Sequence, residues 1–207
     1  MIELLVVVAI MAILLGLAIP AFQGANRGGR VRTAIFQLNS HLNLARQMAI
    51  TTRQDVSVLF PGSLIADYDD NTISLAYASY AVYGKRDGYI GEWRRLPPGV
   101  VFHDTFIPPG DTKPAERFNV FLQGPDYRKS VPFPKIGDGI GTMLGLTFRY
   151  DGALDEAGFN RKSVFITEGW IEYDPNYDSI EPKFKPNTKI FGIEIRPESG
   201  QTRAREY

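Results

Sequence analysis

The chain has 207 residues, with 23 acidic and 23 basic side chains, 44% hydrophobic residues and no cysteine. A net charge of zero provides no overall electrostatic field for nucleic acid, and the lack of cysteine excludes disulfides and thiol chemistry. Once an apolar N-terminal segment is set aside, the remaining length is sufficient for one globular domain with a hydrophobic core.

The first 22 residues, MIELLVVVAIMAILLGLAIPAF, form an apolar run with one charged residue, Glu3, and a proline, Pro20. A helix rises about 1.5 Å per residue, so residues 4–22 extend over roughly 28 Å, close to the thickness of the hydrocarbon layer of a bilayer. We therefore expect residues 1–24 to form a transmembrane helix. Glu3 is expected at the membrane interface or paired with a positive group of a partner, because an unpaired charge in an apolar environment is costly.

Two other interpretations of this segment remain. A secretory signal peptide normally has a basic start and a small-residue cleavage site, and this run has neither. A plain single-span anchor fits the length, but it does not account for Glu3 and Pro20.

Residues 25–52 form the second half of the predicted helix. One apolar stripe follows spacings of three and four, which predicts packing on a sheet; its members are Val31, Ala34, Ile35, Leu38, Leu42, Ala45, Met48 and Ala49. Glycine weakens a helix by roughly 1 kcal/mol relative to alanine. A kink is therefore expected between the two halves, either as a hinge for packing helices in a filament or as an ordinary break between two helices, and the residues that would form it are Gly16, Pro20, Gly24, Gly28 and Gly29.

Residues 53–207 have the pattern of a β-rich globular head. Strands are predicted over residues 55–60, 73–83, 100–106, 117–122, 145–150, 163–173 and 189–196, separated by turns rich in Gly, Pro, Asn and Asp. The predicted fold class is therefore α+β, with a long N-terminal helix, made of a hydrophobic half and an amphipathic half, packed on an antiparallel β-sheet head.

The run IELLVVVAIMAILLGLAIPAF resembles the N-terminal segment of type IV pilins and type II secretion pseudopilins. The resemblance implies a pilin-like fold, cleavage of a leader by a prepilin peptidase, N-terminal methylation and an assembly role for Glu3. The family glutamate is the fifth residue of the processed chain and here it is the third, so the precursor is expected to start upstream of Met1. The implied location is the bacterial inner membrane, with the head outside the cytoplasm, and then a periplasmic or extracellular filament.

The segment LNLARQMAITTRQDVSVLF resembles the end of the helix and the first strand of GspH/FimT-type minor pseudopilins, and residues 148–158 and 190–205 resemble that group in patches. The expected function is thus a minor subunit of a pilus-like or type II secretion pseudopilus filament. A major subunit that forms the shaft is the alternative within this class. The implied partners are other pilin-like subunits, the inner-membrane assembly platform, the prepilin peptidase and, before assembly, membrane lipid.

A head that binds DNA or a surface is the alternative from another class. Its candidate phosphate contacts are Arg196, Arg203 and Arg205, which resemble the C-terminal basic motif of DNA-binding minor pilins. Arginines on an edge strand more often prevent edge pairing, and two glutamates, Glu198 and Glu206, dilute the patch. Nucleic acid is therefore not the expected partner.

The sequence contains no motif that supports catalysis: two histidines are present, and HExxH and GxSxG are absent. Calcium is the one metal suggested, because two segments cluster hard oxygen ligands: Asp67, Asp69 and Asn71, and Asp174, Asn176 and Asp178. Neither segment completes an EF-hand loop, and such clusters most often form turns. We expect no enzyme activity and assign no firm metal site.

Overall fold

The computed structural model describes residues 2–65, 70–109, 119–122, 128–135, 138–155, 162–174 and 179–207. Within the first helix it describes the side chains of residues 3, 4, 6–13 and 29–52.

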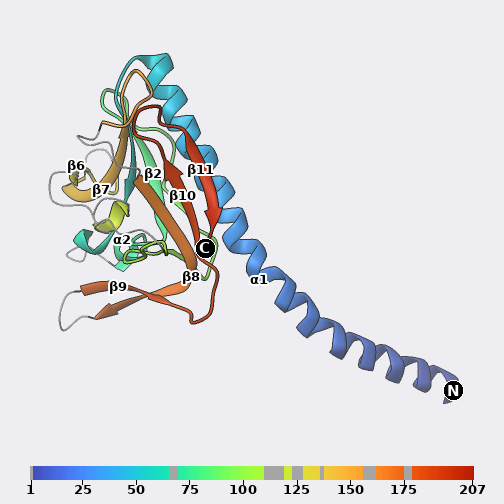
Figure 1. The fold of residues 1–207 in the computed structure, drawn as a ribbon. Coiled ribbons are helices and arrows are strands. Elements are labelled where there is room, and N and C mark those ends of the chain that lie inside the picture. Colours follow the sequence, from blue (N-terminus) through green and yellow to red (C-terminus); the bar gives the residue numbers. More distant parts are fainter. Residues whose placement is uncertain are drawn as a thin grey trace.

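A long first helix leads into a head made of short strands (Figure 1). The helical elements are α1 (Ile2–Thr52), η1 (Ser63–Ile65), α2 (Asp70–Ile73) and η3 (Val120–Leu122). The strands are β1 (Val56–Phe60), β2 (Ser79–Gly84), β3 (Gly88–Tyr89), β4 (Arg94–Arg95), β5 (Val100–Phe102), β6 (Arg128–Pro132), β7 (Ile140–Phe148), β8 (Lys162–Asp174), β9 (Ser179–Phe184), β10 (Phe191–Ile195) and β11 (Thr202–Glu206).

The strands form two sheets in which every pairing of named strands is antiparallel. One sheet has the order β3-β2-β1-β7-β6, with β4 added to β2, and the other has the order β11-β10-β8-β5, with β9 added to β8. Strand β8 continues beyond the second sheet and forms a hairpin with β9, from Gly169↔Phe184 to Asp174↔Ser179. The edge strand β11 runs beside α1 (Figure 1).

The main core lies between α1 and both sheets. Leu38 and Leu42 are fully buried, and α1 contacts β1 of the first sheet as well as β8, β10 and β11 of the second. Strand β1 is buried along its whole length because alternate residues enter different cores. Val58 belongs to the cluster beneath α1, whereas Leu59 belongs to a second cluster on the other side of the sheet.

The predicted fold class is wrong and is corrected as follows. The prediction placed one long helix, with both halves, on a single antiparallel sheet. Among the described side chains of α1, those of residues 29–52 accompany the head, and the described strands of the head form two antiparallel sheets. The physical reason is that the stripe from Val31 to Ala49 is wide enough to be buried by strands of both sheets. The described side chains before Ile13, and Ile13 itself, are exposed and rest on neither sheet.

When only residues with described side chains are counted, no helix is both long and apolar enough to cross a membrane.

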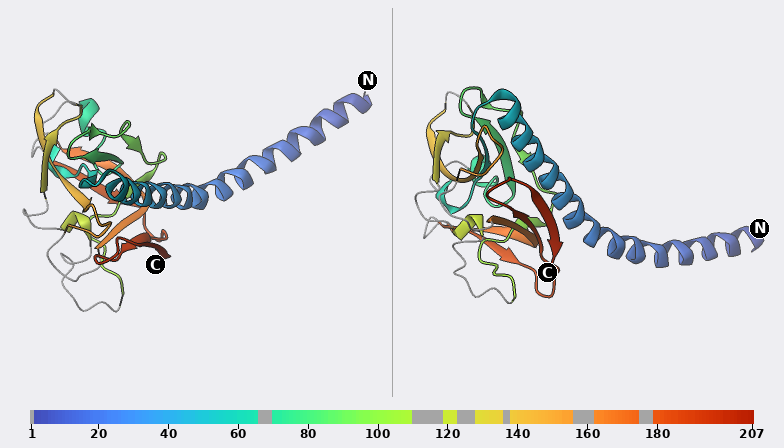
Figure 2. Two further views of the ribbon diagram at one scale, coloured as in Figure 1. Left: turned by 90° about the horizontal axis from the view of Figure 1, so that it is seen from above. Right: turned by 45° about the horizontal axis from the view of Figure 1, so that its top comes forward.

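The backbone of α1 stays helical through the glycine-rich segment at residues 24–29. Its axis bends between the part beside the head and the N-terminal part, which projects away from the head (Figure 2). The glycine-rich segment is therefore not a break in the helix. Whether the bend acts as a hinge in a filament stays a prediction, as do the domain boundaries at residues 24 and 52.

Two of the predicted strands are partly helix or turn, and two others differ in their bounds, because β5 ends at Phe102 and β7 runs from Ile140 to Phe148. Residues 73–83 were expected to be one strand, but the chain forms α2 and a turn before β2 starts at Ser79. Tyr77 in this turn has φ = 50°, a left-handed conformation that an extended pattern does not anticipate. The predicted strand at residues 117–122 ends in the 3-10 helix η3 instead.

Candidate functional site: the projecting end of the first helix

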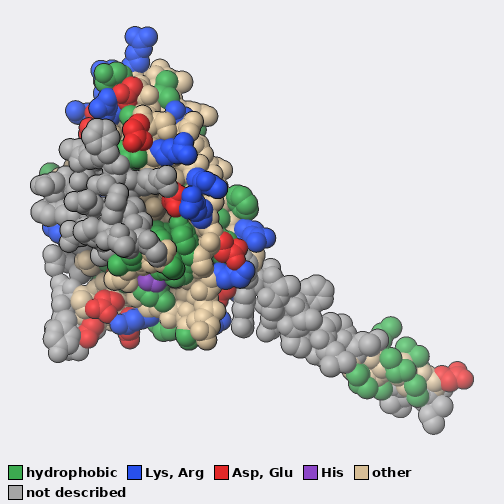
Figure 3. All heavy atoms as spheres, in the orientation of Figure 1, with side chains coloured by type: hydrophobic (Ala, Val, Ile, Leu, Met, Phe, Trp, Pro, Cys, Tyr) green, Lys and Arg blue, Asp and Glu red, His purple; other side chains and the backbone are tan. Residues whose placement is uncertain are grey.

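The N-terminal end of α1 exposes a continuous set of large apolar side chains. Leu4 is 72% exposed and Ile13 is 63% exposed, and similar values, from 51% to 59%, hold for Val6, Val7, Val8, Ile10 and Met11. Figure 3 shows these hydrophobic side chains on the projecting helix, with an acidic side chain at its tip. Covering these apolar side chains would contribute on the order of 10 kcal/mol.

The exposed side chains surround this part of the helix. Three consecutive residues, Val6, Val7 and Val8, are each more than half exposed, and consecutive helical residues point about 100° apart. A helix that is apolar on all sides requires an environment that covers all sides. A single groove on another protein would leave part of this surface in water.

Polar contacts hold the C-terminal part of α1 against two turns of the head. The Nε–H of Arg46 donates to the backbone oxygens of Ser199, at 2.7 Å, and Gly152, at 3.3 Å. One turn earlier, the amide of Asn43 donates to the Thr202 hydroxyl at 3.1 Å. We call Arg46, Gly152, Ser199 and the adjacent Gly200 the helix clamp. The clamp therefore joins the C-terminal part of α1 to both sheets.

A second polar contact lies beneath the helix. The Nδ1 of His41 is 2.7 Å from the backbone oxygen of Gln37 and 2.9 Å from the hydroxyl of Tyr80. Burial raises the pKa of Tyr80 to about 12, with a smaller opposing effect from Arg94. His41 therefore contributes to the joint between the helix and the head.

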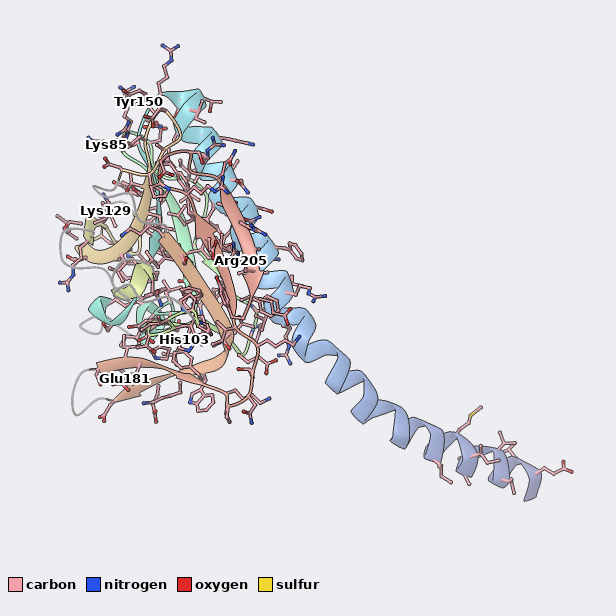
Figure 4. The ribbon with its side chains drawn as sticks, viewed as in Figure 1. Lys85, His103, Lys129, Tyr150, Glu181 and Arg205 are labelled. Atoms are coloured by element: carbon pink, nitrogen blue, oxygen red, sulfur yellow. The ribbon has the colours of Figure 1, made fainter. Side chains whose placement is uncertain are left out.

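The three arginines considered for DNA contact do come together. Arg196, Arg203 and Arg205 line one hollow of about 270 Å³ on the β10–β11 hairpin, and Figure 4 shows Arg205 beside α1. Glu194 lies in the same hollow, and its carboxylate is 3.3 Å from the Nε of Arg205. Nucleic-acid affinity comes from contacts with several phosphates at once, and Glu194 compensates one of the three arginines, so we do not propose a DNA-binding function.

The calcium candidates are mostly outside the described residues. Asp67, Asp69, Asn176 and Asp178 fall there, as does the side chain of Asn71, while Asp174 ends strand β8. Within the described ranges, no group of three or more His, Cys, Asp or Glu side chains is placed to hold a metal ion. Of the residues predicted to form the hinge, Gly16, Pro20, Gly24 and Gly28 lie where the structure does not describe the surroundings of the helix. A methyl group built on the fifth, Gly29, meets no atom within 4 Å.

His103 and Asp104 follow strand β5 directly, and packing accounts for both residues. The ring of His103 stacks on Phe184 with the ring centres 3.7 Å apart, and burial lowers its pKa to about 4. Burial also raises the pKa of Asp104. The amide of Asn119 donates to the backbone oxygens of both residues, at 2.8 and 3.0 Å, which holds the end of the strand in place.

The sequence analysis missed a cleft where α1 leaves the head. Two adjoining hollows of about 270 and 630 Å³ share Glu168 and Lys185 in their walls. The helix supplies Arg30 to the first hollow and Arg32 to the second, and the segment before β10 supplies Lys189. We call these two hollows the collar cleft. Its residues come from segments more than 130 positions apart, so no local motif indicates it.

Comparisons with protein-family models, with curated proteins and with solved structures found no match.

Proposed function

We propose that this chain is a non-catalytic subunit of a helical filament of the type IV pilus or type II secretion pseudopilus kind. The observation that carries the proposal is the all-round exposure of apolar side chains at the projecting end of α1. A bundle of such helices covers every side of each member, and the head then remains on the outside of the bundle. The resemblance of the N-terminal segment to pilins and pseudopilins supports the same assignment, and the resemblance of residues 42–60 to GspH/FimT-type proteins favours a minor subunit over a major one.

In this proposal Glu3 directs assembly. Its side chain is exposed near the end of the apolar helix, and it is the one charged residue of the first 22. Inside a bundle it would lie in an apolar environment, where an unpaired carboxylate is strongly unfavourable. The positively charged N-terminus of a neighbouring subunit is the proposed partner, because it is the charge that a bundle of identical or related helices brings to the same level.

Before assembly, the proposed location of the apolar helix is the bacterial inner membrane, with the head outside the cytoplasm. Lipid covers a helix on all sides, as a bundle does. A prepilin peptidase and an inner-membrane assembly platform are the proposed partners at this stage, and both follow from the family resemblance alone.

Replacement of Glu3 by Ala tests the proposal in the native cell, with Glu198→Ala as the matched control on the exposed surface of the head. Filaments are sheared from the cells, and the subunit is quantified by mass spectrometry in the sheared and membrane fractions. Removal of one partner of a buried pair costs about 3–5 kcal/mol, so we expect incorporation of Glu3→Ala to fall by roughly two to three and a half orders of magnitude while its membrane level is unchanged. Glu198→Ala is expected to behave as the unmodified chain.

Normal incorporation of Glu3→Ala would contradict the pairing. Absence of the unmodified chain from sheared filaments would contradict the filament function itself. The same mass spectra report abundance, which separates a minor subunit from the major one.

A further inference from the structure

We propose that the collar cleft binds the phosphate group of an anionic phospholipid while the apolar helix is held in lipid. This inference rests on the membrane stage of the proposed function and adds a second contact to it, made by the head. Figure 3 shows charged side chains gathered where the helix leaves the head.

The cleft lies at the height expected for lipid headgroups. Gly29, the first helical residue in its wall, follows Phe22, the last residue of the apolar run, by seven positions. At 1.5 Å per residue this separation is about 10 Å along the helix. The headgroup layer begins at the edge of the hydrocarbon and is roughly 5–7 Å thick on each side. Long basic side chains from the cleft can therefore reach the phosphates.

The charges around the cleft favour an anion. Its walls carry four cations, and two carboxylates lie against them: the cations are Arg30, Arg32, Lys185 and Lys189, and the carboxylates are Glu168 and Glu206. The Lys185 ammonium is 3.4 Å from Glu168, and the Arg32 guanidinium is 3.9 Å from Glu206, which also pairs with Lys189. Among the described residues, the cations of this group outnumber its carboxylates by two.

Arg30 is the cation best placed to contact a phosphate. Its Nη1–H donates to the backbone oxygen of Pro98 at 3.0 Å, which orients the guanidinium toward the first hollow. Among the described residues no carboxylate lies within salt-bridge distance of it. The fork of N–H groups on a guanidinium suits phosphate oxygens.

The shape and rim of the cleft fit a membrane surface. Glycines line both hollows, Gly99 beside Arg30 and Gly29 on the helix, so that a headgroup can approach the backbone without meeting a Cβ atom. Trp170, which is 56% exposed, lies at the rim of the first hollow. Tryptophan favours the interface between lipid and water, where its ring is partly apolar and its N–H remains hydrated.

The test measures how the full chain partitions into phosphatidylcholine vesicles with and without phosphatidylglycerol. The variant is Arg30→Gln combined with Arg32→Gln, two exposed helix residues whose loss leaves the core intact. The matched control is Lys85→Gln combined with Lys129→Gln, which removes the same charge from parts of the head far from the helix exit (Figure 4). A basic residue at an anionic surface contributes about 1 kcal/mol, which corresponds to roughly a fivefold change in partitioning. We expect phosphatidylglycerol to increase partitioning of the unmodified chain and of the control, and this increase to fall about 25-fold in the Arg30/Arg32 variant.

Equal phosphatidylglycerol dependence of the two double variants would overturn the proposal, because nonspecific charge would then explain the attraction. Inorganic phosphate should displace the chain more than chloride does at equal ionic strength, and equal displacement by the two anions would also overturn the proposal, because the cleft would then not recognise a phosphate group. Failure of this inference is distinguishable from failure of the proposed function: in the first case the chain still enters vesicles of phosphatidylcholine alone, and in the second it enters none.

Discussion

Replacement of Gly200 by Ala tests the helix clamp directly. Gly200 has φ = 64°, and a Cβ atom at this position would lie 2.1 Å from the backbone oxygen of Gly152 and 3.1 Å from the Cδ of Arg46. Neither turn can move freely, since the Gly200 N–H donates to the Arg196 oxygen at 2.7 Å and the Gly152 N–H donates to the Arg149 oxygen at 2.8 Å. A new side chain must therefore push apart the two turns that hold α1.

The magnitude follows from two separate costs. A left-handed conformation costs an alanine about 1–2 kcal/mol, and overpacking against backbone adds about 1–3 kcal/mol. We expect Gly200→Ala to lower the free energy of unfolding by about 3–4 kcal/mol. Urea denaturation of the full chain in mild detergent, followed by the fluorescence of the head tryptophans, measures this change.

Gly91→Ala is the matched control, because Gly91 has φ = 84° and a Cβ atom there meets nothing within 4 Å. It carries the conformational cost without the contact, so the expected loss is about 1 kcal/mol. If both substitutions destabilise the chain equally, the close approach of Gly200 to Gly152 does not restrain the clamp and the reasoning is refuted.

Two further predictions concern the core and the pH dependence of stability. Leu38→Ala removes a fully buried side chain beneath α1 and should lower the free energy of unfolding by about 2–5 kcal/mol in the same assay. Phe36 is 61% exposed on the same helix, so Phe36→Ala should change the stability little. Similar losses for the two variants would show that a different face of the helix packs on the head. His103 has a pKa of about 4 in the folded chain against 6.5 when unperturbed, so its stabilising effect is complete above pH 6.5 and is lost as the pH falls toward 4. His103→Phe keeps a ring against Phe184 and should remove this loss of stability. The raised pKa of Asp104 acts in both chains, so its effect cancels in the comparison. Parallel stability profiles of the two chains between pH 4 and 6.5 would contradict the lowered pKa of His103.

The packed part of α1 was predictable because its stripe is local. Apolar residues at spacings of three and four from Val31 to Ala49 identify one helix face, and the residues of that face are buried with the exception of Met48, which is half-buried. The number of sheets was not predictable in this way. Strand β1 alternates between two cores, and an alternating pattern does not reveal whether the second face meets water or another cluster.

The candidate sites differ in the same way, because some depend on residues close in sequence and others on long-range pairing. The exposed apolar run and Glu3 were evident from consecutive residues, and the arginines of the β10–β11 hairpin are close in sequence as well as in space. The collar cleft joins residues 29–32 to residues 168–191, and the sheet order that brings them together is set by long-range pairing. The role of Gly152 in the clamp depends likewise on a turn nearly 50 residues away.

The two parts of α1 differ in what can cover them. The C-terminal part has one apolar stripe, which the head buries apart from the half-buried Met48. In the proposed function, that part moves from lipid into a helix bundle, and lipid tails are about as apolar as the side chains of the bundle. Burial of apolar surface is then nearly equal before and after the transfer and cannot drive assembly. We infer that a polar group distinguishes the two environments, and Glu3 is the one acidic or basic residue among the first 22. It follows that Glu3→Ala should affect assembly and leave lipid association unchanged, whereas loss of the collar cations should affect lipid association through the head.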